Sequence, residues 1–268
     1  MKESLLQKNP KSKIIQNGYI NIYSQLNDKE KRQLGYKLKY KDLHPEWDET
    51  MVYLARMFAI YSAANSVVLD AGCGNGNYLI DENRRSISWA VGVDADERSF
   101  EKNICLDELI VSDLENLPFE KNTFDSVTSL WVLEHLQNPE KVFREIKRVL
   151  KPGGIFFFAT PNKKFMPLWG VSLLNFFGVN SWLNQRLFGR YEKDIFKTYY
   201  RANTISQIKT LSRGLFDVVE IKYNYDPSYT SFNSFTFDLS NTLYKIFAKS
   251  DFHLFSPHIV GILKKGQS

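Results

Sequence analysis

The sequence contains few cysteines and histidines and no long apolar segment. Its 2 cysteines, Cys73 and Cys105, and 4 histidines are too few for a disulfide framework or a cysteine-rich zinc cluster. The longest apolar stretches, residues 155–159 and the interrupted residues 167–179, are shorter than the roughly 20 residues of a membrane-spanning helix. No apolar segment follows Met1, as a secretory signal would require. The sequence therefore predicts a cytoplasmic protein without a bound metal.

Charge of one sign is not concentrated in any part of the chain. The 35 lysines and arginines exceed the 30 aspartates and glutamates by 5, and the lysines are scattered instead of forming a block. This mildly basic balance favours an ordinary solvated surface. An anionic partner, either a membrane surface or a nucleic acid, is the alternative.

Aromatic residues are abundant. They make up 15% of the chain, with 20 phenylalanines and 14 tyrosines, within a composition that is 43% hydrophobic and 24% charged. Such a composition is typical of a globular protein, and the length suits one large α/β domain with an elaborated end. Some of the aromatic side chains are available to line an apolar pocket.

Strand-like and helix-like segments alternate in the first two thirds of the chain. Short apolar runs predict strands at residues 66–70, 89–94, 109–111, 124–130 and 155–160. Helical periodicity predicts helices at residues 49–61, 77–83 and 140–150, the last ended by Lys151-Pro152-Gly153-Gly154. This alternation favours a parallel sheet covered by helices on both faces.

The two ends of the chain follow other patterns. Residues 1–48 are polar and lysine-rich, with a weak helical signal at residues 28–34, and we expect them to form an N-terminal extension of a domain spanning residues 49–268. Its core would be residues 64–162, followed by a variable region to residue 214. The C-terminal part predicts helices at residues 204–211 and 235–248, and strands at residues 216–223 and 258–263.

A glycine-rich stretch, "VLDAGCGNGNYL" at residues 68–79, follows the first predicted strand. Ligands of open parallel sheets bind beyond the carboxyl ends of strands. Gly72, Gly74 and Gly76 allow backbone amides to approach a ligand closely, and the next helix adds its N-terminal amides. The stretch therefore predicts a site for an anion or a carboxylate.

The second predicted strand ends at Asp94, where an acid can accept hydrogen bonds from both hydroxyls of a ribose. This indicates a nucleoside-containing cofactor. A P-loop is excluded, since no Gly-Lys-Ser/Thr follows the glycines. A dinucleotide loop would place its third glycine where Asn77 stands, which disfavours a nicotinamide dehydrogenase. Taken alone, the loop leaves a glycine-rich turn with a chance aspartate as the alternative.

Four segments occur in a fixed order: "VVLDAGCGNGNYL", "VGVDAD", "SDLENLPFEKNTFDSVTSLWVLEHL" and "REIKRVLKPGGIFFFATPN". Together, over residues 64–162, they resemble the class I S-adenosylmethionine-dependent methyltransferases, in particular the type 11 group that includes ubiquinone and menaquinone biosynthesis enzymes. The resemblance implies a Rossmann-like, doubly wound, seven-stranded sheet, mostly parallel, with helices on both faces and an acceptor-side insertion. Residues 216–223 and 258–263 would form its terminal pair, with the last strand antiparallel.

The resemblance also implies a cofactor, S-adenosyl-L-methionine, and its product, S-adenosyl-L-homocysteine. Asp94 would bind the ribose hydroxyls, Asp113 the adenine amino group, and the glycine loop the methionine part, with Cys73 serving as a small packed residue and not as a nucleophile. The cofactor-binding residues implied are Asp70, Ala71, Gly72, Cys73, Gly74, Gly76, Asp94, Ala95, Asp113, Leu114, Leu130 and Trp131.

Methyl transfer to an oxygen of high pKa needs a general base as well as alignment. His135, in "WVLEHL", is the candidate catalytic residue, with Glu134 beside it to orient the ring. The alternative is that His135 only caps or packs beneath the cofactor.

The acceptor side has two candidate segments. Tyr199, Tyr200 and Arg201, in "DIFKTYYRANT", predict binding of a polar or anionic head group, or else an aromatic helix start that packs on the sheet. Residues 167–179 are either a lid over an apolar substrate, a segment in peripheral contact with a membrane, or ordinary core.

We therefore expect a methyltransferase that acts on a small-molecule acceptor, apolar or lipid-linked, with O-methylation favoured. The alternatives are a cofactor-binding protein without transferase activity and a nucleic-acid methyltransferase. The second alternative is disfavoured, because "LWVLEHL" stands where many such enzymes carry an Asn/Asp-Pro-Pro-Tyr/Phe signature, and because the chain has no strong basic stripe.

Overall fold

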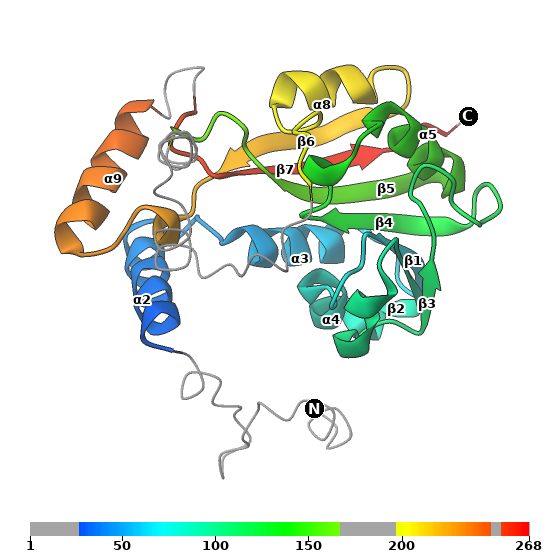
Figure 1. Ribbon diagram of the computed structural model, residues 1–268, viewed down its shortest axis with the longest axis horizontal. Coiled ribbons are helices and arrows are strands. Elements are labelled where there is room, and N and C mark those ends of the chain that lie inside the picture. Colours follow the sequence, from blue (N-terminus) through cyan, green and yellow to red (C-terminus); the bar gives the residue numbers. More distant parts are fainter. Residues whose placement is uncertain (1–26, 167–196, 248–252, 268) are drawn as a thin grey trace, which may run out of the picture. The chain divides into compact units, whose positions relative to one another are not determined.

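The computed structural model describes residues 27–166, 197–247 and 253–267, so the predicted segment 167–179 lies outside the described residues (Figure 1). The chain divides into two compact units. The larger unit comprises residues 49–226 and 243–268, and the smaller unit comprises residues 1–48 and 227–242.

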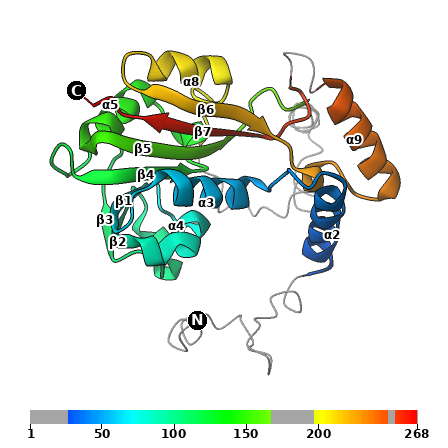
Figure 2. The ribbon, with the colours of Figure 1, turned by 180° about the vertical axis from the view of Figure 1, so that it is seen from behind.

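The larger unit is built on a seven-stranded sheet with the order β3-β2-β1-β4-β5-β7-β6 (Figure 2). Strand β7 runs antiparallel to both β5 and β6, and the other neighbours are parallel. This confirms the predicted fold class, including the antiparallel pair at the end of the sheet. The strands are β1 (Ser66–Ala71), β2 (Ile87–Asp94), β3 (Glu108–Val111), β4 (Phe124–Leu130), β5 (Leu150–Pro161), β6 (Asp217–Asn224) and β7 (His258–Lys264).

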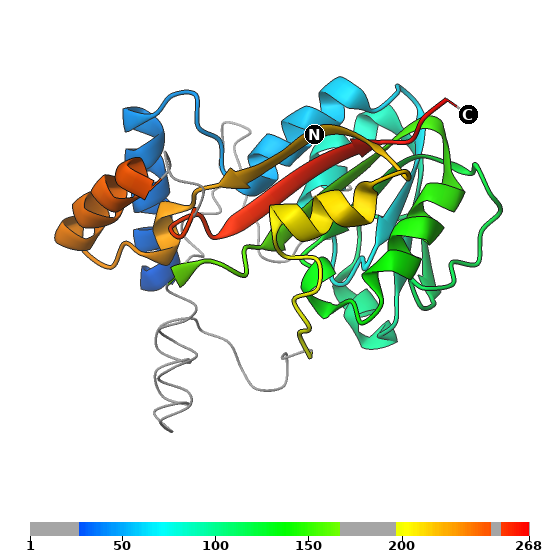
Figure 3. The same cartoon turned by 90° about the horizontal axis from the view of Figure 1, so that it is seen from above.

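Helices pack on both faces of this sheet (Figure 3). On one face, α5 (Pro139–Val149) and α8 (Ile205–Ser212) bury apolar side chains such as Phe143 and Ile208. On the other face, α3 (Thr50–Tyr61) and α4 (Tyr78–Asn83) contribute Phe58 and Leu79. Because side chains alternate along a strand, the interior strand β5 supplies apolar side chains to both cores, and it is buried on both faces as its sequence predicts.

Two elements extend by several residues beyond their predicted limits. Strand β5 begins at Leu150, so residues 151–154, expected only to end a helix, are part of the strand; Gly153 N–H donates to Lys265 O at 2.9 Å. Helix α2 (Asp28–Leu43) is much longer than its weak sequence signal. Its start is fixed by a reciprocal cap, in which Asn27 and Glu30 each accept the other's backbone N–H.

The smaller unit combines α2 with the first part of α9 (Ser234–Phe247). The rings of Tyr36 and Phe237 stack with centroids 5.3 Å apart, and Lys39 Nζ lies 4.4 Å from the Phe237 ring centre. Nothing in the sequence pattern indicates that residues 227–242 group with the N-terminal residues. The pairing depends on an aromatic contact between segments some 200 residues apart in the chain.

Among the helices that the structure describes, none combines the length and the apolar character that crossing a membrane requires.

Replacing Gly261 with alanine is expected to destabilise the larger unit. Gly261 in β7 is paired with Phe158 in β5, and an added Cβ would collide with the Phe158 ring. Overpacking of this kind costs about 1–3 kcal/mol, which should lower the melting temperature by several degrees. Thermal unfolding followed by circular dichroism measures the change. The control is Gly266→Ala, since a Cβ there meets no atom within 4 Å; equal stability of the two variants would contradict the prediction.

Candidate functional site

The carboxyl ends of β1, β2 and β4 open into a cavity of about 750 Å³ within the larger unit. Most of the residues predicted from the sequence meet in its lining, whereas Ala71, Tyr200 and Arg201 do not reach it. The predicted residues found in the lining are Asp70, Gly72, Cys73, Gly74, Gly76, Asp94, Ala95, Asp113, Leu114, Leu130, Trp131, His135 and Tyr199.

The glycine loop folds back on the end of β2. Gly72 N–H and Cys73 N–H both donate to Val93 O, at 2.8 and 3.1 Å. Gly72 has a φ of 82°, and a Cβ at this position would collide with the Val132 side chain. Both the backbone conformation and the space therefore require glycine. Cys73 is buried, and burial raises the pKa of its thiol, which agrees with its predicted role as a small packed residue.

Asp94, the last residue of β2, is held by two backbone N–H groups. Its Oδ2 accepts from Gly74 N–H at 3.0 Å, and its Oδ1 accepts from Asp96 N–H at 3.0 Å. A carboxylate oxygen has a second acceptor position. Asp94 can therefore order the glycine loop and still accept two hydroxyl groups from a ligand in the cavity.

Asp70, near the end of β1, is almost fully buried and lines the same cavity. Its Oδ1 accepts from Thr128 Oγ1 at 2.8 Å and from Asn77 Nδ2 at 2.9 Å, whereas its Oδ2 has no hydrogen-bond partner among the described residues. Burial raises the pKa of this carboxyl to about 6. A buried carboxylate with an unsatisfied oxygen is costly unless a donor or a cation meets it. The cavity is therefore suited to a ligand with a positive charge at this end.

Asn77 was missed as a site residue by the sequence analysis. Its Oδ1 caps α4 by accepting Leu79 N–H at 2.9 Å, and its Nδ2 holds Asp70 and contacts Thr128 Oγ1 at 3.1 Å. An asparagine immediately before a helix is a recognisable cap signal. The contact with Thr128 carries no sequence signal, because the two residues are 51 positions apart.

The residues that follow β3 form a second wall of the cavity. Asp113 Oδ1 accepts Glu115 N–H at 2.9 Å, and Asp113 O accepts Asn116 N–H at 3.0 Å, so the turn is closed on itself. Glu115 is in turn held at the start of α5, where Nδ2 of Asn138, the residue before the helix, donates to it at 2.8 Å and Lys141 Nζ lies 3.2 Å away. Since Asp94 is paired with Val111, this turn lies beside the end of β2.

Trp131, directly after β4, has an unusual backbone. Its φ of 61° is in the left-handed region, which bulky residues rarely adopt. Its N–H donates to Ala159 O at 2.9 Å, and its ring lies edge-on to the His258 ring with centroids 4.7 Å apart. His258 Nδ1 is 2.9 Å from Thr50 Oγ1 at the start of α3. Strand β5 thus holds the Trp131 backbone, and β7, supported by α3, holds the indole in the cavity wall.

His135 lies in the short 3₁₀ helix Leu133–His135, and its ring is fixed from one side. Its Nδ1 is 3.0 Å from Lys197 O. Because a carbonyl oxygen only accepts, Nδ1 carries the proton, and the lone pair of the neutral ring is on Nε2. This Nε2 is 3.9 Å from a carboxylate oxygen of Glu134.

Residues 197–201 are attached to the same turn by further hydrogen bonds. The Tyr199 and Tyr200 N–H groups donate to Glu134 O at 2.7 and 3.2 Å, and Arg201 Nη1 donates to Gln137 O at 2.7 Å. These contacts bring Tyr199 into the cavity lining with His135. Tyr200 and Arg201 hold the segment in place instead.

Several lining residues were not singled out from the sequence. They come from α3, the glycine loop, α4, the turns after β2, β3 and β4, and α5. They are Met51, Asn75, Asn77, Tyr78, Asp96, Ser99, Glu115, Val132, Leu136, Gln137 and Val142. Among the described residues, no group of three or more His, Cys, Asp or Glu side chains could hold a metal ion.

Comparison with known proteins gives the following similarities. Residues 69–158 match the family model described as a methyltransferase domain. The chain is 34% identical over 115 residues to a tRNA (carboxymethyluridine(34)-5-O)-methyltransferase of Arabidopsis thaliana, covering 41% of this chain and 26% of that protein. It is 33% identical over 105 residues to a ubiquinone biosynthesis O-methyltransferase of Neisseria meningitidis, covering 36% of this chain and 44% of that protein. The chain thus matches less than half the length of either relative.

The fold has solved counterparts. One is a chain from the complex between the Trm112 methyltransferase activator of Haloferax volcanii and a protein assigned as a methyltransferase. It has a TM-score of 0.52 and 17% sequence identity, and the match covers 88% of this chain and 97% of that chain. At this identity, the likeness concerns the fold alone.

Proposed function

We propose, on the premise that the chain belongs to the class I S-adenosylmethionine-dependent methyltransferases of the type 11 group, that it transfers a methyl group from S-adenosyl-L-methionine to a small-molecule acceptor. The observation that carries the proposal is the cavity in which the glycine loop, Asp94 and the unsatisfied Asp70 carboxylate meet. These three features match the ribose hydroxyls and the ammonium group of that cofactor.

The residues present fit the cofactor part by part. Asp94 would accept the two ribose hydroxyls and Asp113 the adenine amino group, while Asp70 Oδ2 would receive the ammonium of the methionine part. The bound cofactor supplies a methyl group that is already electrophilic on its sulfonium. The work left to the chain is to bind both reactants in line and to exclude water, which can contribute roughly 7–11 kcal/mol.

The charges in the cavity support an uncharged acceptor. The described lining contains five carboxylates and no lysine or arginine, and like charges disfavour an anionic ligand. Arg201, one of three residues predicted to bind a polar or anionic head group, donates to Gln137 O. We therefore propose that Tyr199 contacts the acceptor, with Trp131 and Met51 as further apolar walls, and that the acceptor is apolar. The five carboxylates are Asp70, Asp94, Asp96, Asp113 and Glu115.

Transfer to oxygen is supported by His135. Its Nε2 carries the lone pair, and the ring is held by Lys197 O at 3.0 Å, within a lining that also includes Tyr199. In this position Nε2 would take the proton of an acceptor hydroxyl. The similarity to a ubiquinone biosynthesis O-methyltransferase agrees with an oxygen acceptor.

Substituting His135 with asparagine should separate catalysis from binding. The asparagine Nδ2 can still donate to Lys197 O, but the variant has no basic nitrogen. Loss of a general base lowers turnover by about 10²–10⁴-fold, and we expect cofactor affinity to stay within about twofold. Turnover and S-adenosylhomocysteine titration of the same preparations provide both values. Near-normal turnover of His135→Asn would instead favour a packing role for the histidine.

A second candidate function is methylation of an RNA nucleoside, which the similarity to a tRNA methyltransferase favours. Both candidates are tested by incubating the protein with methyl-labelled S-adenosylmethionine and either phenolic, quinone and lipid acceptors or total tRNA. Label in the extracted small molecules supports the first candidate, and label in tRNA supports the second. Failure of the wild-type protein to bind S-adenosylhomocysteine in calorimetry would overturn both.

A further inference from the structure

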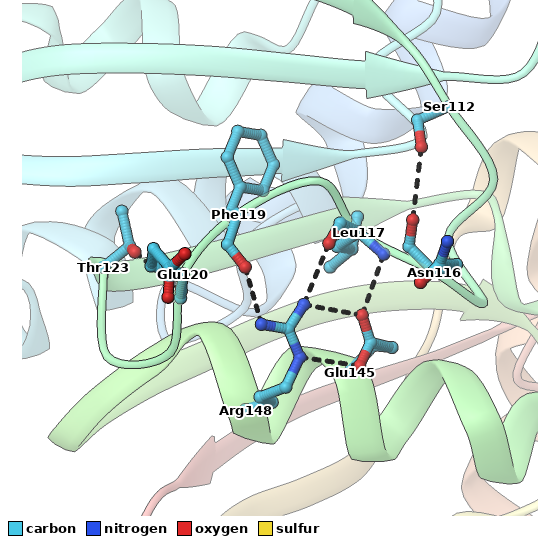
Figure 4. Close-up of polar contacts among 8 residues, drawn as sticks. All are labelled: Ser112, Asn116, Leu117, Phe119, Glu120, Thr123, Glu145 and Arg148. Atoms are coloured by element: carbon cyan, nitrogen blue, oxygen red, sulfur yellow. Dashed lines mark hydrogen bonds and ion pairs between the residues drawn. The ribbon is translucent and has the colours of Figure 1, made fainter.

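The loop between β3 and β4 leaves the cavity wall and crosses the last turns of α5, where it is hydrogen-bonded by Arg148 (Figure 4). The guanidinium donates to two backbone carbonyls of this loop: Nη1 to Phe119 O at 2.6 Å and Nη2 to Leu117 O at 2.9 Å. Two further N–H groups donate to Glu145 one turn earlier, from Nε at 2.7 Å and from Nη2 at 2.8 Å. Arg148 therefore joins the loop to α5 by a planar, fixed set of bonds.

Glu145 also binds the loop, as an acceptor where Arg148 is a donor. Its Oε2 accepts Leu117 N–H at 2.8 Å, so both backbone polar groups of Leu117 are bound by this arginine–glutamate pair. Hydrogen bonding from Arg148 holds the pKa of Glu145 below its usual range, so the pair stays ionised at neutral pH. Figure 4 shows Leu117 lying directly over the pair.

A short path connects this attachment to the cavity. Leu117 follows Asn116, whose N–H donates to Asp113 O at 3.0 Å and whose O accepts from Ser112 Oγ at 3.3 Å. Asp113, Leu114 and Glu115 line the cavity, whereas Arg148 does not. The start of α5 holds Glu115, and its C-terminal half holds Leu117, so α5 anchors the loop on both sides of Asn116.

We propose that Arg148 is a positioning residue for the adenosine end of the cofactor, acting through Leu117 on the turn that presents Asp113. The inference rests on the proposed function, because it assigns Asp113 to the adenine. Arg148 itself touches no ligand. Its role is to keep the Asp113 turn in the conformation that binds adenosine before the ligand arrives, so that less ordering accompanies binding.

The test compares Arg148→Met with Arg144→Met. Methionine keeps much of the apolar stem but removes every donor. The exposed Arg144 is on the same helix and, among the described residues, forms no hydrogen bond with the loop. Calorimetry at 15 °C would use two probes, S-adenosylhomocysteine and 5′-methylthioadenosine, which lacks the amino-acid group. We expect Arg148→Met to weaken both by about tenfold, leaving the ratio of the two dissociation constants unchanged, and Arg144→Met to bind like the wild type.

The ratio of the two dissociation constants distinguishes a positioning role of Arg148 from a general destabilisation of the fold. Such destabilisation would also disturb Asp70, and the affinity for S-adenosylhomocysteine would then fall more than that for 5′-methylthioadenosine. If Arg148→Met does not fold, Arg148→Lys keeps the charge but not the planar fork, and we expect it to weaken both probes severalfold.

Wild-type affinity for both probes in a folded Arg148 variant overturns the inference, as does a lower melting temperature without weaker binding. Neither result affects the proposed function. Absence of binding to the wild-type protein would instead overturn the proposed function itself.

Discussion

Replacing Asp70 with asparagine is expected to weaken S-adenosylhomocysteine binding at pH 8 by about ten- to a hundredfold, since a charge-assisted hydrogen bond contributes about 1.5–3 kcal/mol. The asparagine can keep the bonds from Asn77 and Thr128 through its oxygen. It lacks the negative charge that Asp70 Oδ2, unsatisfied among the described residues, would offer to the ligand's ammonium. Binding of 5′-methylthioadenosine, which has no ammonium, should be unchanged.

The same substitution should change how the stability of the ligand-free protein depends on pH. Burial raises the pKa of Asp70 from 3.8 to about 6. A carboxyl whose pKa is raised by folding destabilises the folded state increasingly as the pH rises from 3.8 through 6, and the full penalty is present above that window. Asp70→Asn has no such penalty. Its free energy of unfolding relative to the wild type should therefore rise by about 1 kcal/mol between pH 5 and pH 8.

Urea unfolding at several pH values measures this difference, and the comparison removes the titrations that both proteins share. A high pH, which destabilises the ligand-free wild-type protein, should favour ligand binding. The reason is that protonation of Asp70 below about pH 6 removes the negative charge that binds the ligand's ammonium. The wild-type affinity for S-adenosylhomocysteine should then fall on acidification, and that of Asp70→Asn should not. If the free energy of unfolding depends on pH in the same way for both proteins, the raised pKa of Asp70 is contradicted.

Replacing Asp94 with alanine is expected to weaken S-adenosylhomocysteine, 5′-methylthioadenosine and adenosine alike, each by about ten- to a hundredfold or more. Two effects combine. The ligand loses the acceptor for its ribose hydroxyls, and the glycine loop loses the bond from Gly74 N–H to the carboxylate. The equal loss for all three ligands separates Asp94 from Asp70, whose substitution should affect only the ligand with an ammonium group.

A matched control is available in a carboxylate that is bound to the same strand. Asp107 accepts the N–H of Ala90, in the middle of β2, at 2.8 Å, but it does not line the cavity. Asp107→Ala therefore removes a carboxylate that supports β2 without removing a ligand contact. We expect it to lower the melting temperature and to leave adenosine binding intact. If Asp94→Ala binds S-adenosylhomocysteine like the wild type, the assignment of the ribose site is wrong.

Much of the larger unit could be predicted from local pattern. A buried strand such as β5 needs a continuous apolar run, and α5 needs apolar residues at helical spacing, so both are visible in the sequence. The limits of α2 could not be predicted in the same way, because this helix has no clear apolar face and depends on its cap and on packing against Phe237.

The residues of the candidate site also fall into those with a local sequence signal and those that only the fold brings together. Gly72 and Asp94 could be found, because a left-handed turn after one strand and an acid at the end of the next are local requirements. His135 and Tyr199 were separate candidates in the sequence. Only the folded chain carries residues 197–201 back to the turn after β4, where the bond between His135 and Lys197 spans 62 positions.

By itself, the sequence determined the alternation of strands and helices, the glycine loop and the acids in register with it, since each depends on neighbours a few residues away. The tertiary structure alone decided which carboxylate is left unsatisfied and which side chains brace the cavity. Asp70 and Trp131 each have a partner on another strand, and Arg148 has partners in the loop over α5, at separations of 58 positions for Thr128 and 31 for Leu117. Such contacts follow from the order of strands in the sheet, which places distant segments side by side and has no counterpart in local periodicity.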